Sequence, residues 1–75
     1  MTVSLAALLE QSLQIAWDYL QRTGEIQHAQ AAIDFLTNDI ADRMHRGERS
    51  KLLLANRAIR AYQRHKADHI IELVR

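Results

Sequence analysis

Residues 26–44 read IQHAQAAIDFLTNDIADRM, and their pattern indicates the fold of the whole chain. Apolar side chains recur in this stretch at intervals of three and four residues, at Ile26, Ala29, Ile33, Leu36, Ile40 and Met44. This spacing returns to one side of an α-helix at every turn, whereas a β-strand would need strict alternation. The stretch therefore predicts an amphipathic helix with one apolar face.

Two glycines, Gly24 and Gly47, lie on either side of this stretch and limit the predicted helix. Glycine readily adopts the left-handed conformation that ends many helices, and a basic residue precedes each glycine closely, which suits a helix C-terminus. A glutamate follows each glycine, and its charge suits the positive start of the next helix. We therefore predict an all-α chain of three helices, at residues 4–22, 25–46 and 49–74.

The two outer segments repeat the helical spacing. The first has a wide apolar side that includes Leu5, Leu8, Leu9, Leu13, Ala16, Tyr19 and Leu20, and the third has Leu52, Ala55, Ile59, Tyr62, Ile70 and Leu73. Linkers of a few residues between long helices favour antiparallel neighbours. We predict one helical domain over residues 1–75. It is either an up-down-up bundle of three antiparallel helices or a helical hairpin whose third helix completes the core of a partner.

Composition excludes several classes of protein. The chain has 75 residues, 48% hydrophobic and 25% charged, which argues against disorder, and it has no cysteine for a disulfide or a thiolate metal site. No basic residue precedes the N-terminal apolar stretch, whose longest unbroken run is residues 5–9. We therefore expect neither a secretory signal nor a membrane span, and we expect a cytoplasmic protein.

The sequence lacks the motifs that carry catalysis. Neither glycine belongs to a phosphate-binding loop, and no serine has the context of a nucleophile elbow. A bundle this small also has little volume for a substrate pocket. We therefore predict that the protein is not an enzyme, has no catalytic residues, and needs neither a cofactor nor a small-molecule substrate.

Three residues near the C-terminus raise the question of a metal site. His65, His69 and Glu72 follow one another at intervals of four and three residues, so that they share one side of a helix. Imidazole and carboxylate groups bind divalent metals, but a histidine pair at this spacing is a weak signal by itself. We favour a surface or half-buried histidine pair and predict no metal.

Five apolar residues either lie outside the predicted core faces or extend those faces at an edge. Phe35 lies about opposite the apolar face of its helix, and consecutive leucines point in different directions. Small proteins always expose some apolar side chains, so one interpretation needs no function. However, a chain of this size buries little surface alone and often gains stability from a partner subunit. We therefore predict a self-association interface that includes Trp17, Phe35, Leu53, Leu54 and Ile71.

The net charge of +1 hides two parts of opposite sign. Residues 1–42 contain one basic and six acidic residues, and residues 43–75 contain nine basic and three acidic ones. Arg57, Arg60 and Arg64 form one stripe of the third helix. This stripe has three possible interpretations. It is a solvated face balanced by the acidic second helix, a surface that steers an antiparallel dimer, or a set of phosphate contacts with nucleic acid. The small net charge and the long helices argue against the last interpretation.

Two functional hypotheses follow from these patterns. The first is a small non-enzymatic helical interaction or regulatory module that forms a homodimer, or binds another protein, through apolar helix faces. The second is a nucleic-acid-binding accessory protein that contacts phosphates through Arg57, Arg60 and Arg64. Neither hypothesis involves a membrane.

Overall fold

Three α-helices make up most of the chain. The computed structural model describes the backbone of residues 4–74 and the side chains of residues 4–68. The helices are α1 (Leu5–Arg22), α2 (Ala29–His45) and α3 (Lys51–Val74), and all three pack against one another. The predicted all-α fold of three helices is therefore confirmed. Within residues 4–74, no helix has both the length and the apolar character needed to cross a membrane.

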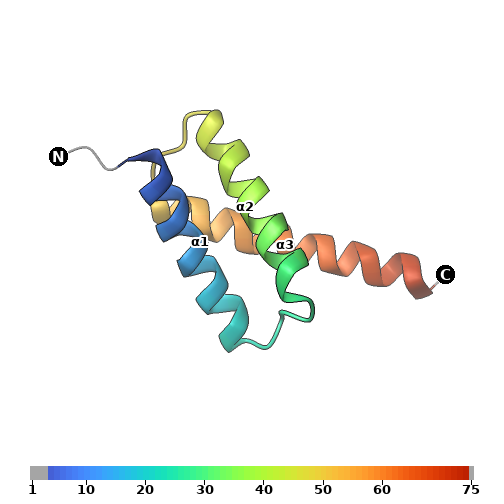
Figure 1. Cartoon of the computed structure of the whole chain (residues 1–75). Helices are drawn as coiled ribbons and strands as arrows, with labels where there is room; N and C mark the ends of the chain where they lie inside the picture. The colour runs from blue at the N-terminus through green and yellow to red at the C-terminus, as the bar shows by residue number, and fades with distance from the viewer. Residues whose placement is uncertain (1–3, 75) are drawn as a thin grey trace.

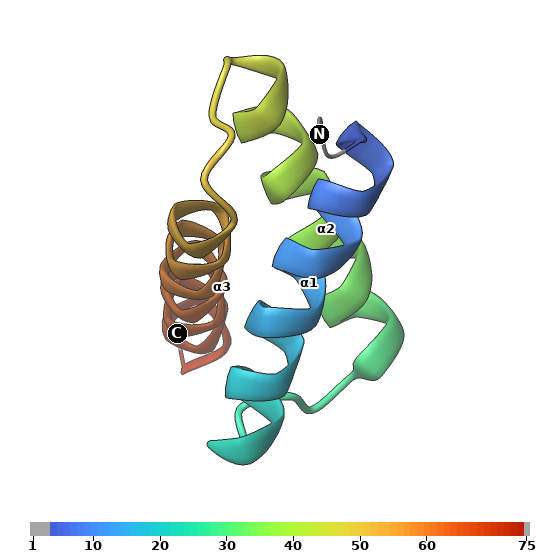
Figure 2. The same cartoon turned by 90° about the vertical axis from the view of Figure 1, so that its left-hand side faces the viewer.

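The helices are arranged as a hairpin with a third helix across it. α1 and α2 run antiparallel, and α3 passes across both of them, so that its C-terminal part extends beyond the hairpin (Figure 1). When the molecule is turned by 90°, α3 is seen almost end-on while α1 and α2 run from top to bottom (Figure 2). The third helix thus completes the core of its own chain.

The core is built from large side chains that alternate with small ones. The buried residues are Leu8, Ser12, Ala16 and Leu20 of α1, Ala32, Leu36, Ile40 and Met44 of α2, and Leu54, Ala55, Ala58, Ile59 and Tyr62 of α3. The small residues on all three helices let the helix axes approach closely. The one polar member, Ser12, donates a 2.7 Å hydrogen bond from its hydroxyl to the Leu8 carbonyl, so its burial leaves no polar group unpaired.

Linker 1, residues 23–28, contains the glycine that ends α1, Gly24. Gly24 has a φ of +71°, and its N–H donates to the Gln21 carbonyl (3.2 Å), while the Glu25 N–H donates to the Leu20 carbonyl (3.0 Å). These two hydrogen bonds form a Schellman motif, which pairs carbonyl groups that a helix end would leave free. The predicted role of Gly24 is confirmed.

Linker 1 is longer than predicted, because α2 begins at Ala29 and not at residue 25. The Glu25 carboxylate accepts hydrogen bonds from the Gln63 amide (3.1 and 3.2 Å), and its carbonyl accepts one from the Lys66 ammonium (2.9 Å). Ile26 packs against the core from outside the helix. These contacts with α3 and the core hold the start of the linker in a non-helical conformation.

Linker 2, residues 46–50, ends α2 in the same way. Gly47 has a φ of +111°, its N–H donates to the Met44 carbonyl (3.0 Å), and the Glu48 N–H donates to the Arg43 carbonyl (3.1 Å). This is again the pairing of a Schellman motif. Both glycines therefore end helices, as the sequence predicts.

Linker 2 then turns directly into α3, which begins two residues later than predicted. One carboxylate oxygen of Glu48 accepts hydrogen bonds from the N–H groups of Arg49 (3.0 Å) and Ser50 (2.9 Å). The Ser50 hydroxyl accepts from the Leu53 N–H (3.3 Å), as an N-cap residue does, and helical structure starts at Lys51.

Two of the predicted apolar faces are rotated in the structure. On α2, Ala29 is exposed and Ile33 half-buried, whereas Ala32 is fully buried. On α3, Leu54 is fully buried and Leu52 is 62% exposed, the reverse of the predicted order. The predicted Leu36, Ile40, Met44, Ala55, Ile59 and Tyr62 are buried, so the crossing of α3 over the hairpin (Figure 1) shifts only the edge of each buried face.

Candidate functional site: an arginine-lined groove between α2 and α3

A shallow groove lies along the contact where α3 crosses α2. It consists of three adjoining hollows: Arg43 and Arg57 line both the first and the second, and Phe35 and His65 line both the second and the third. Along α2 the groove extends from His28 to Arg46, which is about 27 Å at the rise of a helix. Its two ends differ in chemistry.

Five arginines gather at one end, which we call the arginine end. Arg43 is in α2 and Arg46 directly follows it, whereas Arg57, Arg60 and Arg64 belong to α3. The three arginines of α3 form the stripe that the sequence predicts. The other two were not expected at this site, because only the packing of α2 beside α3 brings them to it. The i, i+4 spacing of Asp39 with Arg43 and of Asp42 with Arg46 is the signal that could have drawn attention to them.

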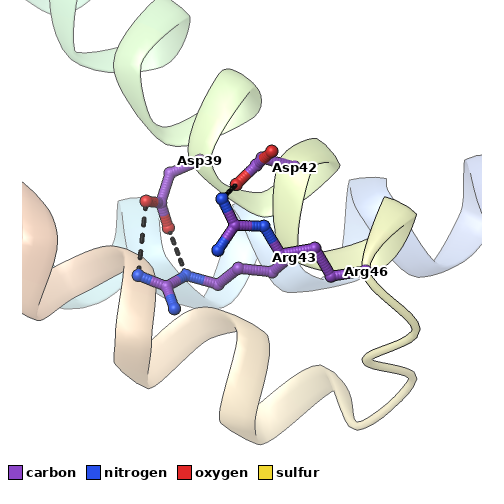
Figure 3. Close-up of polar contacts among 4 residues, drawn as sticks. All are labelled: Asp39, Asp42, Arg43 and Arg46. Atoms are coloured by element: carbon purple, nitrogen blue, oxygen red, sulfur yellow. Dashed lines mark hydrogen bonds and ion pairs between the residues drawn. The ribbon is translucent and has the colours of Figure 1, made fainter.

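Two ion pairs hold Arg43, in the last turn of α2, and Arg46, which follows the helix (Figure 3). The Arg43 guanidinium donates to both Asp39 carboxylate oxygens, at 2.7 and 3.4 Å, and this pair is half-buried. The Arg46 guanidinium lies 3.1 Å from the Asp42 carboxylate, but these side chains are 77% and 56% exposed, so the second pair contributes little stability. The pairs orient both cations along α2.

The three arginines of α3 differ from these two. Arg57, Arg60 and Arg64 are exposed, and no carboxylate among the side chains of residues 4–68 forms an ion pair with them. The two carboxylates that line the same hollows are Glu48, which bonds to backbone N–H groups of linker 2, and Asp68. The positive charge available at the arginine end therefore comes mainly from the three arginines of α3.

Rings gather at the opposite end, which we call the aromatic end: Phe35, Tyr62 and His65. The Phe35 ring stacks on His65, with 4.8 Å between ring centroids and 25° between planes, and meets Tyr62 edge-on at 5.8 Å and 67°. The prediction that Phe35 faces away from the core is wrong, because α3 crosses on that side and half-buries the ring. Phe35 thus forms part of this groove.

The other predicted interface residues have different fates. Leu54 is fully buried in the core of one chain, so it does not belong to an exposed surface. Trp17 is half-buried against the core, and Leu53 is 40% exposed. Ile71 lies outside the residues whose side chains are described. The structure adds two exposed leucines that the sequence analysis placed in the core faces, Leu5 (55%) and Leu52 (62%).

The candidate metal stripe is only partly described. His65 stacks on Phe35, whereas the side chains of His69 and Glu72 lie outside the described residues. Within the described part of the chain, no group of three or more histidines and carboxylates could hold a metal ion.

Comparison of the chain with protein-family models, with curated proteins and with solved structures finds no match. The groove is therefore interpreted from the chemistry of its own side chains.

Proposed function

We propose that this protein is a small non-enzymatic interaction protein that binds nucleic acid, with the phosphate backbone lying along the arginine end of the groove. The observation that carries this proposal is the gathering of five arginines from two helices, three of them without an ion pair to any described side chain. Guanidinium groups form paired hydrogen bonds with phosphate oxygens.

The charge distribution supports this proposal over the objection that the net charge is small. Binding of a polyanion depends on the cations at the contact and on the counterions they release, and not on the net charge of the whole chain. Most acidic residues of the chain lie before residue 43, and Asp39 and Asp42 of α2 are already paired with Arg43 and Arg46. A cytoplasmic location belongs to the same proposal.

Fluorescence anisotropy with a labelled 20-nucleotide strand tests the proposal. If three to five phosphates are neutralised, affinity should fall by about 20-fold to 130-fold between 50 and 200 mM salt, given a slope of about −0.7 per contact. The double variant Arg60→Glu and Arg64→Glu should bind about tenfold more weakly or worse. Arg22→Glu with Lys51→Glu is the matched control, since it changes the net charge equally on exposed residues that do not line the groove. Equal losses in both double variants, or no binding at 50 mM salt, would reject the proposal.

Self-association is a second candidate function, which the exposed leucines favour. Leu52 and Leu53 are adjacent on α3, and Leu5 lies at a separate apolar hollow with Leu9 and Met44. Full burial of one leucine contributes about 1.5–3 kcal/mol, so a few such contacts decide whether two chains associate. Leu54 is buried in the core and Trp17 and Phe35 are half-buried against it, so Leu53 is the exposed member among the predicted interface residues whose side chains are described.

Light scattering over a concentration series tests self-association. A homodimer that uses these leucines should become a monomer when Leu52→Glu and Leu53→Glu are combined, while Arg60→Glu with Arg64→Glu should leave its mass unchanged. A wild-type monomer at high micromolar concentration would eliminate this candidate.

A further inference from the structure

The aromatic end of the groove contains a recess with a mixed lining. It has a volume of about 210 Å³, with Phe35 and Tyr62 as its apolar part and His28, Gln27, His65 and Lys66 as its polar part. Pockets for drug-sized ligands have about 300–1,000 Å³, so this recess has room for one planar ring system and not for a larger molecule. It adjoins the arginine end through Phe35 and His65.

The ring of His65 provides a stacking surface at this recess. Phe35 covers one face of the imidazole, and His65 as a whole remains an exposed residue. Phe35 is itself supported by the edge of Tyr62, which is buried in the core. The core therefore supports the stacked rings of Phe35 and His65 through Tyr62. Aromatic side chains of this kind, next to a basic groove, are the surfaces on which unpaired bases stack.

Hydrogen-bonding groups border the same recess. Gln27 and His28 come from linker 1, and an amide offers both donors and an acceptor to the edge of a base. The hydrogen bonds of Gln63 and Lys66 to Glu25 tie this linker to α3. The linker that carries Gln27 and His28 is thus held against α3 beside the rings.

From this juxtaposition we infer that the recess takes one unpaired base of a single strand whose phosphates lie on the arginine end. This inference rests on the proposed function and narrows the partner to single-stranded nucleic acid. In a duplex, each base is stacked and paired inside the helix, and extracting it costs a few kcal/mol. The groove therefore discriminates against a duplex although it binds the same phosphates.

The experiment compares three labelled ligands by fluorescence anisotropy at 50 mM salt: a 12-nucleotide oligo-dT strand, an abasic strand with the same number of phosphates, and a 12-base-pair duplex. Wild-type protein should bind oligo-dT about tenfold more tightly than the abasic strand, the effect expected for stacking of one base. His65→Ala should remove most of this preference, so that oligo-dT and the abasic strand bind with nearly equal affinity. His65→Phe should keep the preference for oligo-dT that His65→Ala loses, because phenylalanine also provides a flat aromatic surface.

The matched control is Tyr19→Ala, which removes another exposed ring, 47% exposed and outside the groove. It should keep the full preference for oligo-dT. Circular dichroism should show unchanged helical content for each variant. If wild-type protein binds all three ligands equally, the base recess is rejected while backbone binding stands. If Tyr19→Ala loses the preference and His65→Ala keeps it, the site is misplaced and the inference is wrong. If none of the ligands binds, the proposed function and this inference fail together.

Discussion

Linker 1 and linker 2 contain the same Gly-Glu pair at their second and third positions and end the preceding helix with the same two backbone hydrogen bonds, but their glutamates then act differently. Glu25 bonds to α3, 38 and 41 residues further along the chain, whereas Glu48 bonds to the next two backbone N–H groups. The Gly-Glu motif therefore determines how each helix ends, whereas the contacts of the glutamate determine the course of the chain after it. The difference between the linkers also explains the groove, since linker 1 borders its aromatic end and linker 2 its arginine end.

The largest change in the free energy of unfolding should come from a substitution in the core, which supports both linker 1 and linker 2. Leu36 is fully buried on α2 between the linkers. Leu36→Ala should lower the free energy of unfolding by about 2–5 kcal/mol, because it removes buried apolar contacts and leaves a cavity. Urea unfolding followed by circular dichroism measures this change. The exposed Leu52→Ala is the control and should cost less than about 1 kcal/mol. Equal costs at the two positions would contradict the described core.

The next prediction separates the two glycines. Open space surrounds the Cβ position at both, so only backbone strain decides the cost of alanine. Gly24 has a φ of +71°, close to the left-handed region, while the φ of +111° at Gly47 lies well outside it. We expect Gly24→Ala to cost about 1 kcal/mol and Gly47→Ala about 2 kcal/mol of unfolding free energy. Thermal unfolding would give the ranking, and a larger loss at Gly24 would contradict it. Gly24→Asn should cost less than Gly24→Ala, because asparagine tolerates this conformation.

A third prediction tests the different roles of the two glutamates. Glu25→Ala and Glu48→Ala should each lower the free energy of unfolding by about 1 kcal/mol, because each removes hydrogen bonds to a charged group. The two should differ in binding. Glu25→Ala loosens linker 1 and should reduce the preference for oligo-dT over the abasic strand, whereas Glu48→Ala should leave that preference intact. Fluorescence anisotropy with the two strands distinguishes them, and identical profiles would mean that linker 1 does not shape the recess.

The smallest expected effect concerns the charge at the arginine end. Asp39→Asn removes the carboxylate that pairs with Arg43, so affinity for the abasic strand should rise by about two- to fivefold at 50 mM salt. Asp18→Asn on α1 makes the same change in net charge away from the groove, and like Asp39 this residue has an i, i+4 hydrogen-bond partner, Gln14. It should leave the affinity within about twofold. An equal gain in both variants would show that only the net charge matters.

The sequence predicts the features that depend on neighbours along the chain. Helical spacing gives three helices, and Gly24 and Gly47 give the two helix ends, because both depend on local backbone geometry. The stripe of Arg57, Arg60 and Arg64 is also visible in the sequence, since one helix carries all three.

Features that depend on contact between helices were not predictable in this way. The start of α2 depends on hydrogen bonds from Gln63 and Lys66, which no pattern near Glu25 reveals. The exchange of Leu52 and Leu54 between surface and core depends on how α3 crosses the hairpin. For the same reason, the sequence does not assign Arg43 and Phe35 to the groove, because their place there depends on how α3 crosses α2 (Figure 1).

The contact between linker 1 and α3 has a consequence for the order in which the molecule assembles. The turn between α1 and α2 takes its final form only when a helix from the other end of the sequence is in place. A nascent chain that has produced only the first two helices therefore lacks part of what shapes their connection. We accordingly expect the three helices to form and melt as one cooperative unit, and not as a stable pair joined later by a third.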